Sequence, residues 1–327
     1  MKTLVATPRI SKADLFETVY SLNKKGGPEV YEYDHIDNCM DAITSMMKQG
    51  IITNEEIEMI KNNCEFLKSD RSVMGHIKIK PFGYAGDYLI IDRIYRKDVS
   101  TKYTKWDNYS MHNIAAEAVR NRKEFFKALI HEKLKTHKTL RLLNIASGPA
   151  RDLKEIFDEI DPKRLTVTCV EMDKRAIEHA TNVCGEYMDR ITFINQNVFK
   201  FRTEEKFDLV WSAGLFDYFT DKLFVKLVKT FQTFLSMNGE IVIGNFSKEN
   251  PGRVYMEVFG EWFLNHRSPA ELIQLAIEGG IDKNKIMVDK ECLGVNLFLR
   301  MRNEGSINSI AGDALNTILK EFVLSEN

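Results

Sequence analysis

The 327-residue sequence has little of what would mark a secreted, metal-binding or membrane protein. Its cysteines are odd in number and lack CxxC spacing, which argues against a disulfide framework or a cysteine-rich metal site. They are Cys39, Cys64, Cys169, Cys184 and Cys292. No apolar run approaches the roughly 20 residues that cross a bilayer, and the N-terminal residues lack the apolar segment of a secretory signal. We therefore expect free thiols, no metal centre, no stable membrane insertion and a cytoplasmic protein.

The sequence also has no excess of positive or negative charge. Lysine and arginine number 46 against 47 aspartates and glutamates, which gives a net charge of −1. A nearly neutral chain has no global attraction for nucleic acid, and the sequence has no basic patch interleaved with aromatic residues. We therefore expect a small-molecule substrate and no nucleic acid. At roughly 100–200 residues per domain, the length predicts one large or two ordinary domains.

The first 137 residues carry helical patterns. Apolar residues recur at helical spacing over 36–49, and a shorter helix is predicted over 12–22. Thr53 and Glu56 form a capping-box pattern before another helix. A long helix is predicted over 108–136. These helices make up an expected N-terminal domain, which would cover a ligand site as a lid.

The stretch from Lys80 to Asp87 differs in composition from the helical segments and reads Lys-Pro-Phe-Gly-Tyr-Ala-Gly-Asp. Its proline and glycines indicate a shaped loop, and Asp87 is placed to cap a following helix over 88–97. One interpretation is a structural turn. The other is an active-site loop with Tyr84 facing a ligand.

From about residue 139 the pattern alternates between strands and helices, which predicts a mostly parallel sheet covered on both faces. The last two apolar runs have no helix-length spacer between them, which favours an antiparallel finish. The expected strands are 140–145, 165–170, 191–195, 207–211, 240–244, 285–288 and 295–301. The expected helices are 152–160, 174–186, 222–235, 253–264 and 269–279, with one more over 309–324.

The segment Leu142–Asp152 is the most informative part of this pattern. An apolar strand ends in small residues and a helix begins directly afterwards, so the backbone can approach a ligand at free helix N–H groups. Glu171 closes the second strand, where a carboxylate can accept bonds from a ribose diol. Asn197 and Val198 follow the third strand, where an amide can read an adenine edge. This spacing alone does not separate NAD from S-adenosylmethionine.

Two features favour S-adenosylmethionine. The turn lacks the full G-x-G-x-x-G that a pyrophosphate needs, and the antiparallel finish is not required by a plain dinucleotide domain. Segment 140–302 also resembles class I S-adenosylmethionine-dependent methyltransferases. The matching motifs are Leu143-Asn-Ile-Ala-Ser-Gly-Pro-Ala, Val170-Glu-Met-Asp, Asn197-Val-Phe and Phe207-Asp-Leu-Val-Trp-Ser.

The resemblance implies a Rossmann-like, seven-stranded sheet whose last strand is antiparallel, with S-adenosylmethionine as cofactor. It departs from the family at Asn144, which replaces an acidic residue, at the single glycine of the first motif, and at Asn197, which replaces another acid. The implied cofactor contacts are Ala146, Ser147, Gly148, Glu171, Met172, Asn197, Val198, Ser212 and Ala213. Arg122 or its neighbour Arg120 would fit the cofactor's carboxylate.

Several short motifs resemble the bacterial methyltransferase group that includes the 3-hydroxypalmitic acid methyl ester synthase of quorum signalling. They are 80–87, Ala118-Val-Arg-Asn-Arg122, Ala146–Asp152 and Trp262–Arg267. This resemblance implies carboxyl O-methylation of a 3-hydroxy fatty acid. The alternative is N- or O-methylation of another small metabolite. Two rivals are a non-catalytic cofactor-binding protein and an NAD-dependent oxidoreductase.

Candidates for acceptor chemistry gather after the fourth strand and near residue 260. A carboxylate acceptor is ionised at neutral pH and needs no general base, whereas an amine or hydroxyl acceptor needs one. Asp217 starts a helix or acts in catalysis, and Tyr84 and His266 are the other catalytic candidates. The substrate-binding candidates are Tyr84, Phe216, Tyr218, Tyr255, Trp262 and Arg267. His266 and Arg267 would neutralise an anionic acceptor.

The expected layout is therefore a helical lid and substrate domain over 1–137, a cofactor-binding domain over 138–303 and a helical tail over 304–327. A homodimer formed through the helical domain is compatible with this layout.

Overall fold

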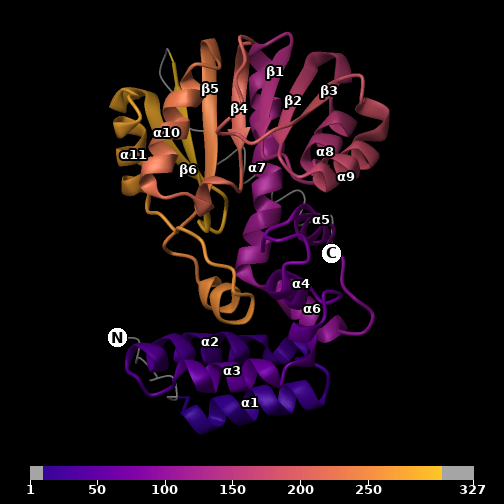
Figure 1. Cartoon of the computed structure of the whole chain (residues 1–327), viewed down its shortest axis with the longest axis vertical. Coiled ribbons are helices and arrows are strands. Elements are labelled where there is room, and N and C mark those ends of the chain that lie inside the picture. Colours follow the sequence, from indigo (N-terminus) through magenta and orange to yellow (C-terminus); the bar gives the residue numbers. More distant parts are fainter. Residues whose placement is uncertain (1–9, 304–327) are drawn as a thin grey trace, which may run out of the picture. The chain divides into compact units, whose positions relative to one another are not determined.

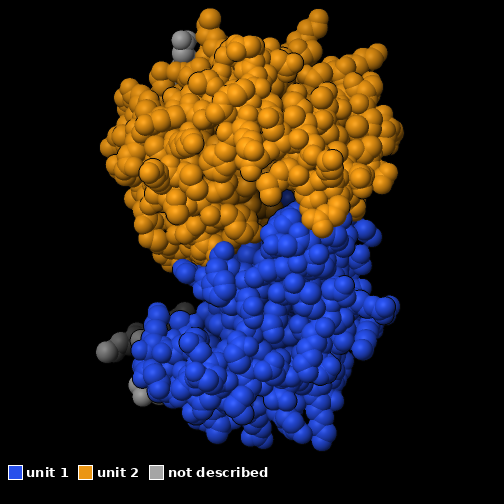
Figure 2. Space-filling view, in the orientation of Figure 1, with its two compact units in different colours: residues 1–116, 251–263 blue, residues 117–250, 264–327 orange. Residues whose placement is uncertain are grey.

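The computed structural model describes residues 10–303, which form two compact units. Of these residues, unit 1 takes 10–116 together with Pro251–Phe263, and unit 2 takes Glu117–Asn250 and 264–303 (Figure 2). The predicted helix over 309–324 lies outside the described residues.

Unit 1 is helical, as the sequence pattern predicts. Thr53 caps its helix as expected, since its hydroxyl accepts the N–H of Glu56 and the Glu56 carboxylate accepts the N–H of Thr53. The methionine-rich face packs inward at Met40 and Met46. The helices are α1 Lys12–Lys24, α2 Tyr33–Lys48, α3 Asn54–Asn62, α4 Val73–Ile79, α5 Tyr88–Arg96 and α6 Thr104–His112.

The single helix predicted over 108–136 is wrong, because the chain breaks at Asn113. This residue has an extended backbone, with φ −52° and ψ 134°, and its side-chain oxygen accepts the N–H of Ala115 at 3.1 Å. Asn113 therefore starts a new helix, α7 Ile114–Thr136. Most of α7 belongs to unit 2, although the expected helical domain reached residue 137.

The helix predicted over 253–264 ends early, because the chain is helical only over 253–259. The structure has one π-helical turn there, Tyr255–Phe259, which belongs to unit 1. Gly260 follows it, and Glu261 takes a left-handed conformation with φ 49° that cannot continue a helix. The Lys61 ammonium bonds the Glu261 carboxylate at 2.6 Å, and the Ser110 hydroxyl lies 2.9 Å from that of Tyr255. Tertiary contacts therefore override the helical pattern of this segment.

Unit 2 contains the predicted seven-stranded sheet, in the order β3-β2-β1-β4-β5-β7-β6. Neighbouring strands run parallel except β7, which is antiparallel to β5 and to β6. This confirms a mostly parallel sheet with an antiparallel last strand. The strands are β1 Leu140–Ile145, β2 Leu165–Glu171, β3 Ile191–Asn195, β4 Phe207–Ser212, β5 Leu235–Phe246, β6 Ile286–Lys290 and β7 Asn296–Arg302.

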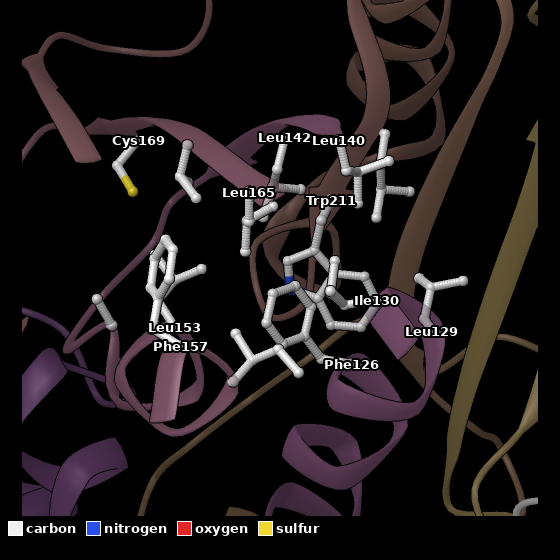
Figure 3. Close-up of a cluster of buried hydrophobic side chains, with 14 of the residues drawn as sticks. Phe126, Leu129, Ile130, Leu140, Leu142, Leu153, Phe157, Leu165, Cys169 and Trp211 are labelled. Atoms are coloured by element: carbon white, nitrogen blue, oxygen red, sulfur yellow. The ribbon is translucent and has the colours of Figure 1, made fainter. Parts of the chain in front are cut away.

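Both faces of the sheet are buried under helices (Figure 1). Leu140 and Leu142 pack toward α7 and α8, while Leu143 and Ile145 point to the opposite cluster with α10 and α11. Side chains along a strand alternate between faces, so β1 contributes to two cores, one of which is drawn in Figure 3. The helices of unit 2 besides α7 are α8 Arg151–Glu159, α9 Lys174–Cys184, α10 Asp221–Gln232 and α11 Pro269–Glu278.

The order of the strands reverses at β1, which has β2 on one side and β4 on the other. In an open α/β sheet, ligands bind outside the carboxyl ends of the strands at such a switch point. The residues that follow β1, β2, β3 and β4 therefore share the edge where a ligand is expected. No helix among residues 10–303 is long and apolar enough to cross a membrane.

Candidate functional site

The turn after β1 has an unusual backbone. Ala146, Gly148 and Ala150 take left-handed conformations with φ of 55°, 56° and 53°. Two of them are alanines, for which this conformation is disfavoured. Strained backbone of this kind occurs at ligand sites, where the surrounding structure holds it in place. The turn therefore has the character of a functional segment, as its small residues predict.

Glu171 holds this turn from the end of β2. Its buried carboxylate accepts the N–H of Gly148 at 3.1 Å through one oxygen and the N–H of Asp173 at 2.9 Å through the other. Burial raises the pKa of Glu171, and the backbone N–H groups partly counteract this rise. Each carboxylate oxygen has a further lone pair. The group can therefore accept bonds from a diol beside Gly148.

Three residues predicted to contact the cofactor follow β2 and β3, namely Met172, Asn197 and Val198. Met172 is 65% exposed, and its sulfur lies 4.0 Å from the Asn197 side-chain nitrogen. The Asn197 side-chain oxygen accepts the N–H of Phe199 at 2.9 Å. Asn195 donates to the carbonyl oxygens of Glu171 and Met172, which ties this edge to β2. Val198, next to Asn197 in the chain, is half-buried and packs against the core cluster that includes α10.

At the end of β4, Ser212 and Ala213 lie beside the turn. The Ser212 hydroxyl donates to the carbonyl of Ile145 at 3.2 Å, and the buried Arg122 donates from α7 to the carbonyl of Ala213. A Cβ at Gly214 would lie 2.9 Å from the Arg122 guanidinium, so a side chain there would displace the guanidinium. Arg122 therefore lies at the predicted edge, while its contact with a cofactor remains a prediction.

These residues fit S-adenosylmethionine in the chemistry of their donors and acceptors. A carboxylate for a diol and a surface for a base lie at neighbouring strand ends. A side-chain carbon built at Gly148 would meet no atom within 4 Å among the described residues, so the turn is open on that side. The Asn144 amide nitrogen is buried without a partner in the described part of the chain. A buried donor of this kind needs a partner.

Asp217 follows β4 and is buried. Its carboxylate accepts the N–H of Phe246 at 2.6 Å, and its carbonyl accepts the N–H of Asn265 at 2.7 Å. Burial raises the pKa of Asp217 to about 6, although the charges of Arg122 and Arg267 lower it. Asp217 thus joins the β4 exit to the end of β5, and its catalytic role remains a prediction.

We expect Asp217→Asn to stabilise the protein at alkaline pH. The folded pKa lies above the usual 3.8, so the stability linked to this group is complete below pH 3.8 and is lost as the pH rises through 6. At pH 8 the variant should gain up to about 3 kcal/mol of unfolding free energy. Urea unfolding at pH 8 and pH 3.5 measures this gain, which should vanish at the lower pH. Asp189→Asn, at an exposed site, is the control, and a loss of stability at pH 8 would contradict the assignment.

Comparison with known proteins agrees with this geometry. Residues 136–290 match the family model of a methyltransferase domain. This chain contains a methyltransferase domain. The predicted enzyme class is therefore confirmed, and so is the predicted fold. No curated protein matched the sequence.

Solved structures are similar to this chain at low sequence identity. A possible exported protein from Bordetella parapertussis is 15% identical with a TM-score of 0.56, over 67% of this chain and 80% of that one. Magnesium protoporphyrin IX methyltransferase from Synechocystis, solved with S-adenosylmethionine, is 9% identical with a TM-score of 0.49, over 71% and 98%. The 1,6-didemethyltoxoflavin-N1-methyltransferase of Burkholderia thailandensis, solved with S-adenosylhomocysteine, is 15% identical with a TM-score of 0.44, over 56% and 79%.

Two of the predicted acceptor residues in unit 2 hold the segment after β4. Arg267 donates to the carbonyls of Phe216 and Phe219 and to the side chains of Asn245 and Asp221. His266 lies within 3.1 Å of the Leu264 carbonyl and 3.3 Å of the Asn250 side chain. These contacts position the loops of the methyltransferase domain, and a direct contact with the acceptor remains a prediction for both residues.

Aromatic residues after β4 divide into buried and exposed ones. Phe216 packs edge-on against Phe224 and Phe231 in the core, with ring centroids 4.7 and 5.7 Å away. Tyr218 is 40% exposed. Tyr218 is therefore better placed than Phe216 to meet a substrate of the methyltransferase domain.

Tyr84, Tyr255 and Trp262 belong to unit 1, although Tyr255 and Trp262 fall within the matched segment 136–290. Tyr255 is buried among the aromatic residues of that unit and contacts Tyr109. Asp87 caps α5 as predicted, by accepting the N–H groups of Leu89 and Ile90. Substrate contacts by Tyr84, Tyr255 and Trp262 remain predictions.

Sequence reasoning missed two residues. His76 lies 2.8 Å from the Asp87 carboxylate, so it joins the two ends of the Lys80–Asp87 loop, but a histidine on a helix gives no signal of this contact. Asp152 is buried beside Arg122, although an acid in the first turn of a helix usually meets solvent. The signal for Asp152 in the sequence is its position four residues after Gly148.

Proposed function

We propose that the protein is an S-adenosylmethionine-dependent methyltransferase that acts on the carboxylate of a small molecule. The observation that carries this proposal is the buried Glu171 carboxylate, which holds Gly148 across the switch point of the sheet. A carboxylate at the end of β2 suits a ribose diol. A turn with one glycine suits a ligand that lacks a pyrophosphate.

The cofactor, when bound, supplies an electrophilic methyl group on a sulfonium. Glu171 would accept bonds from the ribose hydroxyls, and Met172, Asn197 and Val198 would flank the adenine. Arg122 would neutralise the cofactor's carboxylate. The residues after β4 would align the acceptor and keep water away from it, which is the main requirement of methyl transfer.

The hydrogen bonding of the Asp217 carboxylate supports a carboxylate as the methyl acceptor. Its carboxylate is bonded to the backbone of Phe246, which disfavours a role as a freely acting base. A carboxylate acceptor is ionised at neutral pH and needs no base. The motif resemblance makes a 3-hydroxy fatty acid the first substrate to test, and N- or O-methylation of another metabolite is the alternative.

The test follows methyl-labelled S-adenosylmethionine with 3-hydroxy fatty acids of several chain lengths and with amine and hydroxyl acceptors. We expect a labelled product that releases methanol in alkali, because esters hydrolyse there while methylamines and methyl ethers do not. Products that are stable in alkali would contradict a carboxylate acceptor and favour N- or O-methylation of another metabolite. The Glu171→Ala variant, in which no product is expected, controls for a contaminating enzyme.

The assembly and the location of the protein remain predictions. The sequence is compatible with a homodimer, and light scattering of the chain measures its mass. A monomer at micromolar concentration would contradict the homodimer and leave the proposed reaction untouched.

A further inference from the structure

Asn296 is a buried amide at the carboxyl edge of the sheet. It is the first residue of β7 and pairs with Phe246, the last residue of β5. Side chains alternate along a strand, so Asn296 faces the same side of the sheet as Phe298, which stacks on Phe125 of α7. The Asn296 side chain therefore lies on the α7 face, at the edge where β5 ends.

The amide nitrogen of Asn296 can make a hydrogen bond that the chain does not supply. The side chain is 1% exposed, and this nitrogen has no hydrogen-bond partner within residues 10–303. A buried donor that stays unbonded loses its hydration without replacement, and such donors are few in folded proteins. A group of a bound ligand is a natural partner for this amide, because it lies at the ligand edge of the sheet.

Glu291 fixes the start of β7. Its buried carboxylate accepts the N–H of Leu293 at 2.8 Å, that of Val295 at 2.7 Å and that of Asn296 at 3.0 Å. The same carboxylate accepts an N–H of the Asn121 amide on α7, also at 3.0 Å. The segment between β6 and β7 is therefore bound both to itself and to α7, and it holds Asn296 on this face.

The surroundings of Asn296 favour an uncharged ligand group. The negative carboxylate of Glu291 bonds the Asn296 N–H, so an anion at this place would be repelled. Phe246, the strand partner of Asn296, is 2% exposed and adds an apolar side chain on the same face. A hydroxyl group on an apolar chain fits both features, because its oxygen accepts a hydrogen bond and adds no charge.

The register of the sheet relates Asn296 to the exit of β4. Ser212, the last residue of β4, pairs with Ile243, which pairs with Leu299. Asn296 is thus three residues nearer the carboxyl edge and two strands from β4, roughly 10 Å across the sheet. The segment after β4 extends toward it, since the Asp217 carboxylate bonds the last N–H of β5 at 2.6 Å. An acceptor methylated near this exit can reach Asn296 with a group a few bonds away.

We propose that Asn296 binds a hydroxyl group that the methyl acceptor carries a few bonds from its carboxylate. The amide nitrogen donates to the hydroxyl oxygen. An acceptor without the hydroxyl leaves this donor buried and unbonded, so it binds less tightly. The inference rests on the proposed function and adds a residue of β7 that selects the acceptor.

Calorimetry on the chain saturated with S-adenosylhomocysteine tests the inference with decanoate, 2-hydroxydecanoate and 3-hydroxydecanoate. We expect one hydroxy acid to bind about tenfold more tightly than decanoate, the effect of one buried hydrogen bond. Asn296→Leu has a similar size and no donor. It should bring the affinities of the three acids within about twofold of one another and leave that of S-adenosylhomocysteine unchanged.

Two further variants complete the test. Asn296→Ala removes the same amide without adding an apolar group and should also abolish the preference. Asn182→Leu makes the matched change at an exposed site on α9 and should keep the preference. Thermal unfolding shows that each variant folds.

The outcomes separate the two proposals. If the wild-type chain does not bind S-adenosylhomocysteine, the proposed function fails and this inference fails with it. If S-adenosylhomocysteine binds but the wild type binds the three acids equally, or none of them, water alone satisfies the Asn296 amide and the inference is overturned. An equal loss for all three acids in both Asn296 variants would overturn it as well, because it indicates a structural role. The labelled-methyl test decides the proposed function separately.

Discussion

Replacing Glu171 by alanine should lower the affinity for S-adenosylhomocysteine by at least about 100-fold. The buried carboxylate is the predicted acceptor for two ribose hydroxyls, and a hydrogen bond to a charged group contributes about 1.5–3 kcal/mol. Two such bonds exceed the roughly 2.8 kcal/mol that a 100-fold change requires. Titration calorimetry with the purified full-length chain measures the loss.

The controls separate lost contacts from a damaged fold. Glu171→Gln keeps an oxygen for the N–H of Gly148 and should give an intermediate loss. Glu178→Ala removes an exposed carboxylate from α9 and should leave the affinity unchanged. Glu171 also accepts the N–H groups of Gly148 and Asp173, so thermal unfolding at pH 8 checks that each variant folds. If Glu171→Ala binds S-adenosylhomocysteine as tightly as the wild type, the ribose does not bind at the end of β2.

Replacing Glu240 by alanine should lower the free energy of unfolding by about 3–5 kcal/mol, the usual cost of breaking a buried ion pair. Glu240 is fully buried on β5, where its carboxylate bonds the side chains of Lys133, Arg300 and Arg302. Its removal leaves two buried cations, Lys133 and Arg300, without their shared anion. Urea unfolding measures the change, and Glu278→Ala, at an exposed site on α11, is the control.

The pH dependence of stability checks the same group. The charges of Lys133 and Arg300 outweigh desolvation and lower the pKa of Glu240 to about 2. A folded pKa below the usual 4.5 means that this stability is present above pH 4.5 and is lost as the pH falls through 2. The contribution is about 3 kcal/mol. The difference in unfolding free energy between wild type and Glu240→Ala should therefore become smaller in acid. A difference that does not change with pH would contradict this account.

Local chemistry explains what could be predicted from the sequence. β1 and β3 have the predicted bounds because an apolar run of the right length lies between turn residues. Thr53 and Asp87 cap their helices as expected, since a cap depends on residues two or three positions away. Glu171 was found because it ends a strand at the switch point of the sheet.

The rest depends on contacts between residues far apart in the chain. Asn113 breaks the long helix by a cap that competes with a good helical pattern. The 253–264 segment leaves the helix because Lys61 and Ser110 hold it in another conformation. Asp152 and Arg122 come from different helices, so the effect of the arginine's charge on the pKa of Asp152 depends on the folded structure.

The measurement that tests the central claim most directly is a titration of the wild-type chain with S-adenosylhomocysteine and, separately, with NAD. The edge built from Gly148, Glu171 and Asn197 predicts saturable binding of S-adenosylhomocysteine at one site per chain, displaced by S-adenosylmethionine, and no heat from NAD. Binding of NAD with no response to S-adenosylhomocysteine would contradict the account.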